Sequence, residues 1–100
     1  MSIIEEAIQN SGSRFTGGQN APAGSYWNAR TNCVFQQASD GNLPACGIFI
    51  QVTTSGTSTL AQCATAINAL VSGLGYTSAN LHTYTTADLA GFPGQNTNDG

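Results

Sequence analysis

Apolar residues recur at helical spacing over one stretch of the chain, and this stretch predicts the main helix at about 59–72. The apolar positions on one side of it are Leu60, Cys63, Ile67, Leu70, Val71 and Leu74. A spacing of three to four residues is typical of a helix with one buried side. Turn-forming residues at 54–58 precede the stretch, and Gly73 and Gly75 follow, where glycines commonly end helices.

Three further stretches have the pattern of strands. Side chains alternate between apolar and polar from Tyr26 to Gln37, which predicts one strand with a buried side. The apolar run inside 45–53 predicts a central strand, and Asp40-Gly41 marks the turn before it. Residues 76–84 predict a third strand, joined to the second by the helix in a parallel crossover.

The two ends of the chain predict smaller elements. Ser2 and Glu5 form the pattern of a helix-capping box, and apolar residues follow at helical spacing. A helix of about two turns is not stable alone, so its isoleucines dock on the core or on a neighbouring subunit. The glycine-rich residues 11–25 predict either a connector or an arm that anchors Phe15 against a neighbour. Residues 86–89 predict a single turn.

These elements predict one small α+β or α/β domain. It has a three- to four-stranded sheet packed by one main helix, a short N-terminal helix and extended arms. We expect residues 1–25 to hold the short helix and its arm, 26–84 to form a ββαβ core, and 85–100 to form a C-terminal arm. A domain of 100 residues is marginally stable alone, and oligomerisation would add burial that the monomer lacks.

The charge content changes the picture of the surface. The chain has two basic and five acidic residues, no lysine, and a net charge of -3, whereas about a quarter of the residues of an ordinary domain are charged. So little positive charge excludes a nucleic-acid partner, which requires clustered Lys and Arg. A membrane partner is excluded because the chain has neither a basic patch for anionic lipid nor an apolar run of spanning length.

The predicted outer face of the main helix carries no charge, although exposed helix faces usually carry Glu and Lys. Small polar residues on this face are cheap to desolvate and allow another backbone to approach closely. The alternative is a small, solvated helix face. We expect the uncharged surfaces to be buried between subunits, with the following interface residues: Ile3, Ile4, Ile8, Phe15, Ala61, Thr65, Asn68 and Ser72.

The sequence offers no catalytic, cofactor or metal site, so we expect a protein that is not an enzyme. His82 is the single histidine, and a Cys63–His82 pair stays open. The three cysteines include no Cys-x-x-Cys pair, which speaks against zinc. We interpret them as small buried thiols. A bridge between Cys33 and Cys46 stays open if these residues lie on paired strands.

The order of short helix, strands, helix and strand, together with the composition, resembles small phage tail-completion and neck proteins. By composition, the chain also resembles capsid cement proteins. This resemblance implies a non-enzymatic structural protein of a virus or phage particle, in the tail, neck or capsid, whose partners are its own copies and other virion proteins. The acidic first six residues lack the pattern of a signal peptide, so we expect synthesis in the cytoplasm and localisation in the virion.

Two other classes of function stay open. The run Ile48-Phe49-Ile50-Gln51-Val52, the helix, and then Gly73-Leu74-Gly75-Tyr76 look like half of a SPOR-type peptidoglycan-binding domain. That resemblance implies a small binding module for carbohydrate or protein. The pattern of one helix and few strands also permits a small secreted α/β effector.

Overall fold

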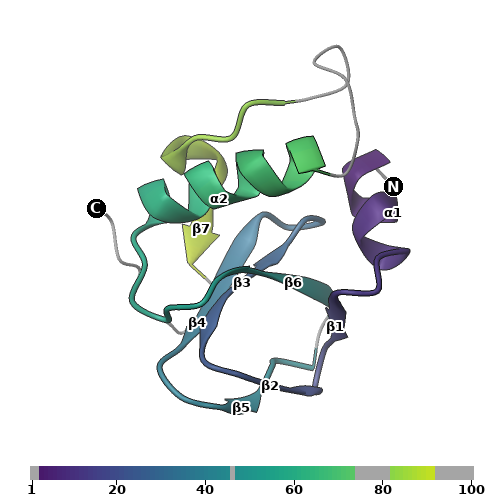
Figure 1. The fold of residues 1–100 in the computed structure, drawn as a ribbon, viewed down its shortest axis with the longest axis vertical. Helices are drawn as coiled ribbons and strands as arrows, with labels where there is room; N and C mark the ends of the chain where they lie inside the picture. The colour runs from purple at the N-terminus through teal and green to yellow at the C-terminus, as the bar shows by residue number, and fades with distance from the viewer. Residues whose placement is uncertain (1–2, 46, 74–81, 92–100) are drawn as a thin grey trace.

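The computed structural model describes residues 3–45, 47–73 and 82–91, and within them the chain is α+β. A mixed five-stranded sheet forms the centre (Figure 1). All its neighbouring strands are antiparallel except β4 and β7, which are parallel. Its strands, in spatial order, are β1 (Arg14–Thr16), β6 (Ile48–Thr53), β3 (Gly24–Asn28), β4 (Cys33–Gln37) and β7 (Ala90–Gly91).

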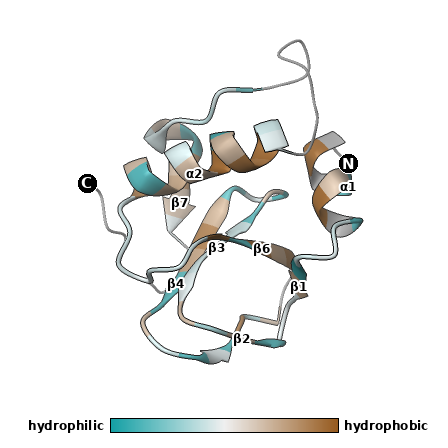
Figure 2. Ribbon diagram, in the orientation of Figure 1, coloured by the Kyte–Doolittle hydropathy of each residue, from teal (hydrophilic) through white to brown (hydrophobic). Residues whose placement is uncertain are grey.

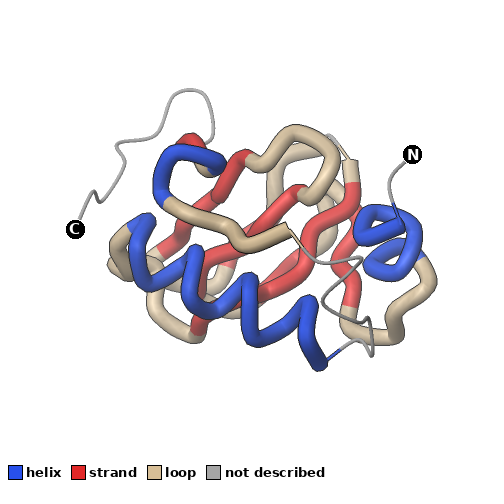
Figure 3. The backbone as a smooth tube through the Cα atoms, turned by 90° about the horizontal axis from the view of Figure 1, so that it is seen from above, coloured by secondary structure: helices blue, strands red, loops and turns tan. Residues whose placement is uncertain are grey.

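Helices cover one face of this sheet, and the main core lies between the two layers (Figures 1 and 3). The helices are α1 (Ile3–Gln9), α2 (Leu60–Gly73) and the single 3-10 turn η2 (Thr86–Asp88). Trp27, Val34 and Ile50 point from the sheet towards Ile67 and Val71 of α2, and all five are buried. Figure 2 shows brown, hydrophobic segments on the helices and on the strands beneath them.

A second apolar cluster lies on the opposite face of the sheet. Strand residues alternate between the two faces, so Tyr26 and Phe49 point away from the helices that Trp27 and Ile50 contact. The short ribbon of β2 (Asn20–Ala21) and β5 (Gly41–Asn42) closes over them through Ala21 and Leu43. The sheet is therefore buried on both faces, which explains the dense apolar run in β6.

The predicted single strand from Tyr26 to Gln37 is wrong, because the chain turns back inside it. Asn32 adopts a left-handed backbone with φ of 60°, and its N–H donates to the carbonyl of Asn28 at 2.8 Å. Asn28 Oδ1 accepts a second bond from the N–H of Arg30 at 2.9 Å. Asparagine tolerates this conformation without glycine, so the hairpin of β3 and β4 has no Gly or Pro to mark it.

The expected N-terminal arm at 11–25 is also wrong. Three of its residues form β1 along the edge of β6, two more form β2, and Gly24 begins β3. The N–H of Gly17 donates to the carbonyl of Gly47 at 2.8 Å, and the N–H of Gly18 donates to the carbonyl of Leu43 at 3.0 Å. The segment is held to the domain although its composition is typical of a mobile loop.

The predictions for the centre of the chain are confirmed. Strand β6 lies between β1 and β3, and α2 covers 60–73 where a helix was expected at 59–72. The expected third strand at 76–84 falls mostly outside the described residues, and 82–84 are not a strand. The described strand that follows α2 is β7, which pairs in parallel with β4 and not with β6. It lies inside the stretch expected to be a C-terminal arm. The single turn expected at 86–89 is present as η2.

Candidate functional site

The outer face of α2 is the most distinctive surface of the described chain. Its exposed residues are Ala61, Gln62, Thr65, Ala69 and Ser72, and α2 contains no charged residue along its whole length. The hydroxyl of Thr65 donates back to the carbonyl of Ala61 at 3.1 Å. The outer face of α2 therefore presents mostly short side chains with methyl, hydroxyl and amide groups. Such a surface can pack against another protein without burying a charge.

A reciprocal capping box begins this helix. Gln62 N–H donates to Thr59 Oγ1 at 3.1 Å, and Thr59 N–H donates to Gln62 Oε1 at 2.9 Å. These two bonds satisfy backbone donors that the first turn of a helix leaves free. The box fixes where α2 starts and how its uncharged face is presented.

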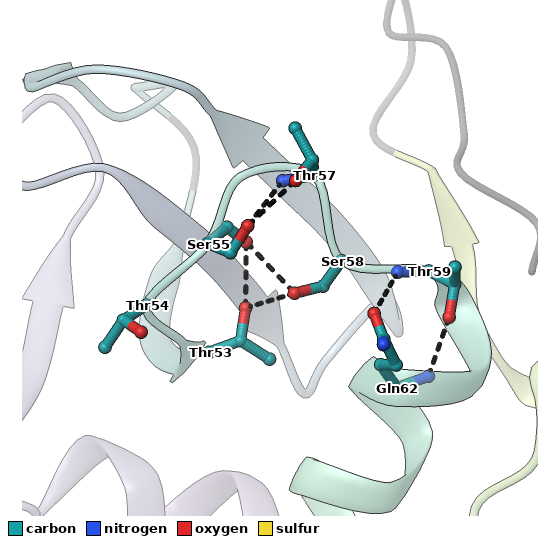
Figure 4. A pocket seen from close by; sticks show the side chains of 7 residues that line it. All are labelled: Thr53, Thr54, Ser55, Thr57, Ser58, Thr59 and Gln62. Carbon is teal, nitrogen blue, oxygen red and sulfur yellow. Dashed lines mark hydrogen bonds between the residues drawn. The ribbon is translucent and has the colours of Figure 1, made fainter.

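An open hollow of about 690 Å³ lies beside this helix start and is lined by hydroxyl and amide groups. Figure 4 shows its lining residues: Thr53, Thr54, Ser55, Thr57, Ser58, Thr59 and Gln62. The hydroxyls of Thr53 and Ser58 are 2.9 Å apart, as are those of Ser55 and Thr57. The lining side chains include no acid, base or thiol. The hollow offers hydroxyl and amide groups for hydrogen bonding, and its lining holds no acid or base that would activate one of these hydroxyls.

The loop that forms the hollow is tied to the sheet beneath it. Gln36 Nε2 donates to Ser25 Oγ at 3.0 Å and to the carbonyl of Ser58 at 2.6 Å. Ser25 Oγ donates in turn to the carbonyl of Ser55 at 2.9 Å. A Cβ at Gly56 would collide with the carbonyl of Gln37, so the loop lies directly on β4. The hollow and the adjoining face of α2 therefore form one fixed, uncharged surface.

Two of the predicted interface residues belong to the interior of the monomer. Ile4 is 7% exposed and Ile8 is 1% exposed, both within the core beneath the helices. The prediction that they lie between subunits is therefore wrong, because they already dock on the chain's own core. The side chain of Ile3 lies outside the described part of the structure. Phe15 is half-buried and packs edge to face on Tyr26, with ring centroids 5.3 Å apart.

Asn68 also has a role within the chain that the sequence did not reveal. Its Oδ1 accepts the N–H of Tyr84 at 2.7 Å, and its Nδ2 donates to the carbonyl of Tyr84 at 3.0 Å. One amide thus holds both backbone groups of one residue, as a strand neighbour would. Ala61, Thr65 and Ser72 are the predicted interface residues that the structure leaves exposed on α2.

The cysteines and the histidine form no joint site in the described residues. Cys63 is fully buried on the inner side of α2, and burial raises the pKa of its thiol, although a hydrogen bond with Ser25 opposes the shift. His82 is instead exposed and paired with Asp88, with 3.2 Å between Nε2 and Oδ1. Within 3–45, 47–73 and 82–91, no three potential ligands gather for a metal ion.

The possible bridge between Cys33 and Cys46 stays a prediction, because Cys46 lies outside the described residues. Cys33 is a free, half-buried thiol on β4, and the neighbours of β4 are β3 and β7. Cys33 therefore also differs from the expectation of a buried thiol.

No protein-family model, curated protein or solved structure matches this chain. Among the described helices, none has the length and apolar character required to cross a membrane.

Proposed function

We propose that this chain is a non-enzymatic structural protein that acts through subunit contacts in a large assembly, as a tail, neck or capsid-associated component of a virus particle. The observation that carries the proposal is the uncharged surface formed by the outer face of α2 and the adjoining hollow. The centres of protein interfaces are depleted of charged residues, because a buried charge requires a partner to offset its desolvation.

The fold supports the same function. The described chain buries both faces of its sheet, so a copy can fold before it meets its neighbours. The exposed α2 residues Ala61, Thr65 and Ser72 follow one another at helical spacing along the face and would meet a partner along the whole helix. Contact through the α2 face would leave the capping box and the core unchanged, so assembly would need no refolding.

The test is the molar mass in solution, measured by light scattering coupled to size exclusion over a wide range of protein concentration. The proposal expects mass to grow with concentration in the wild-type protein. Thr65→Glu should stay monomeric, because a charge buried without a partner costs several kcal/mol. Glutamate is a better helix former than threonine, so the monomer should still fold.

Ser13→Glu is the matched control. Ser13 is exposed in the loop between α1 and β1, away from α2, so the same added charge should leave assembly unchanged there. If Thr65→Glu assembles like the wild type, the α2 face is not the interface. If the wild-type protein is monomeric at every concentration, self-assembly is wrong and the hollow favours the small binding module instead.

A further inference from the structure

Residues 82–91 form a strap that runs alongside α2 and closes the main core from one side (Figure 3). Its first fixed point is Tyr84, which Asn68 holds by two hydrogen bonds. Its second is β7, where the N–H of Ala90 donates to the carbonyl of Asn32 at 3.2 Å. Between them, Leu89 is 7% exposed and fills part of the core.

One carboxylate organises the turn between these fixed points. Asp88 Oδ2 accepts from the N–H of Thr85 at 2.8 Å and from its hydroxyl at 3.2 Å. Asp88 Oδ1 faces His82 Nε2 at 3.2 Å. The backbone hydrogen bond from Thr85 is the largest cause that lowers the pKa of Asp88, and the contact with His82 adds to it. All three contacts depend on the ionised carboxylate.

Few other charged groups face this carboxylate. The elements packed around the strap, α2, β3 and β4, contain no Asp, Glu, Lys, Arg or His. Arg30 is exposed in the neighbouring turn between β3 and β4. On the strap itself, the Tyr84 phenol has a pKa raised by burial and then by Asp88. The charge that changes at this turn in acid is therefore that of the Asp88 carboxylate.

We propose that Asp88 makes the strap acid-sensitive, so that loss of its negative charge opens the η2 turn and withdraws Leu89 from the core. A protonated carboxyl accepts these hydrogen bonds only weakly. The sign follows from the lowered pKa: Asp88 stabilises the closed strap above its usual value of 3.8 and ceases to do so as the pH falls through its lower folded value. Opening would expose an apolar surface in acid, separate from the uncharged α2 face that is proposed for assembly.

The chain contains a reporter for this event. Trp27 is its single tryptophan and is fully buried beneath the strap. Its ring packs edge to face on Tyr84, with centroids 5.3 Å apart, and its Nε1–H donates to Asn32 Oδ1 at 3.2 Å. Trp27 thus contacts Tyr84, which is the first fixed point of the strap. It also binds Asn32, whose carbonyl accepts the hydrogen bond of Ala90 at the second fixed point.

The experiment follows Trp27 emission and far-ultraviolet circular dichroism from neutral pH into acid. The wild-type protein should show a red shift of Trp27 emission below pH 3.8 before the helical signal is lost. Asp88→Asn should be red-shifted already at neutral pH and should lose the acid transition. His82→Gln, which preserves the capping of Thr85, should move the midpoint upward towards 3.8.

Asp40→Asn is the matched control, because Asp40 is another turn carboxylate, bound to the N–H of Ala23 at 3.2 Å and outside the strap. It should leave the Trp27 midpoint unchanged. The proposal is overturned if emission and helical signal change together in the wild type. It is also overturned if Asp88→Asn and His82→Gln both retain the wild-type midpoint. Should Asp88→Asn fail to fold, the midpoint of His82→Gln alone decides the question.

Discussion

Asn68 of α2 binds both backbone groups of Tyr84, with bonds of 2.7 and 3.0 Å. The residues are 16 positions apart, and the segment that joins them includes the undescribed residues 74–81. This contact fixes the strap against the helix and sets Tyr84 over Trp27. It also means that Asn68 stabilises the monomer, whereas the side chain of Thr65, one turn earlier, is exposed.

We expect Asn68→Ala to destabilise the folded monomer by about 1–3 kcal/mol, because two half-buried hydrogen bonds contribute about 0.5–1.5 kcal/mol each. Urea unfolding followed by Trp27 emission would measure the change. Ser72→Ala, at an exposed position one turn later, should change the free energy of unfolding by less than about 0.5 kcal/mol. Equal effects of the two substitutions would contradict the role given to Asn68.

Gly56→Ala and Gly73→Ala should have opposite effects on stability. A Cβ at Gly56 meets the carbonyl of Gln37, whereas a Cβ at Gly73 has open space around it. Forcing the loop off β4 should cost about 1–3 kcal/mol. Alanine at the end of α2 should stabilise the helix by up to about 1 kcal/mol. Thermal unfolding of the two variants would show the difference in sign, and a stabilised Gly56→Ala would disprove the close approach of the loop to β4.

The thiols of Cys33 and Cys63 should react at very different rates with a disulfide reagent. In a Cys46→Ser background, the half-buried Cys33 should label in the folded protein. The buried Cys63, whose pKa is raised, should label on the order of 1000-fold more slowly, since only unfolding exposes it. Added urea should increase the labelling rate of Cys63 far more than that of Cys33. Similar rates in buffer would show that the inner side of α2, which carries Cys63, is not packed against the sheet.

The elements that could be predicted from sequence are those whose signals are local. The apolar spacing of α2 and the turn residues before it predict the helix almost to its observed ends. The apolar run of β6 predicts a central strand because a strand with neighbours on both sides and both faces buried has no polar side. These patterns involve residues that are close together in the chain, so they can be recognised without knowledge of the fold.

The predicted strand across the β3–β4 hairpin failed for a specific reason. In the sequence, the alternation of apolar and polar side chains continues through Asn28–Asn32. In the structure, the turn there pairs Trp27 with Val34 and Tyr26 with Phe35. Phe35 therefore lies on the face opposite to Trp27, where the alternation had placed both on one side. Asparagine at φ of 60° made the turn, and asparagine is also common in exposed strand ends and loops, so its signal is weak.

The candidate surface was predicted in part. The uncharged face of α2 follows from periodicity, and Ala61, Thr65 and Ser72 are exposed as this requires. The roles of Ile4, Ile8 and Asn68 did not follow, because each depends on which distant segment packs against it. An apolar helix side is equally compatible with the chain's own core and with a neighbour. The hollow of hydroxyls arises only when its loop is tied to Ser25 and Gln36 of the sheet.

The sequence by itself determined the main helix, the central strand and a surface almost without charge, since spacing and composition act within a few residues of chain. The tertiary structure alone decided the hairpin at Asn28–Asn32, the edge strands β1 and β7, and the strap bound by Asn68. The edge strands and the strap depend on hydrogen bonds between residues far apart in the chain. The hairpin depends on the left-handed backbone of Asn32 and on the pairing of β3 with β4. Two- and three-residue strands bury too little apolar surface to leave a pattern of their own, so only their partners determine that they form.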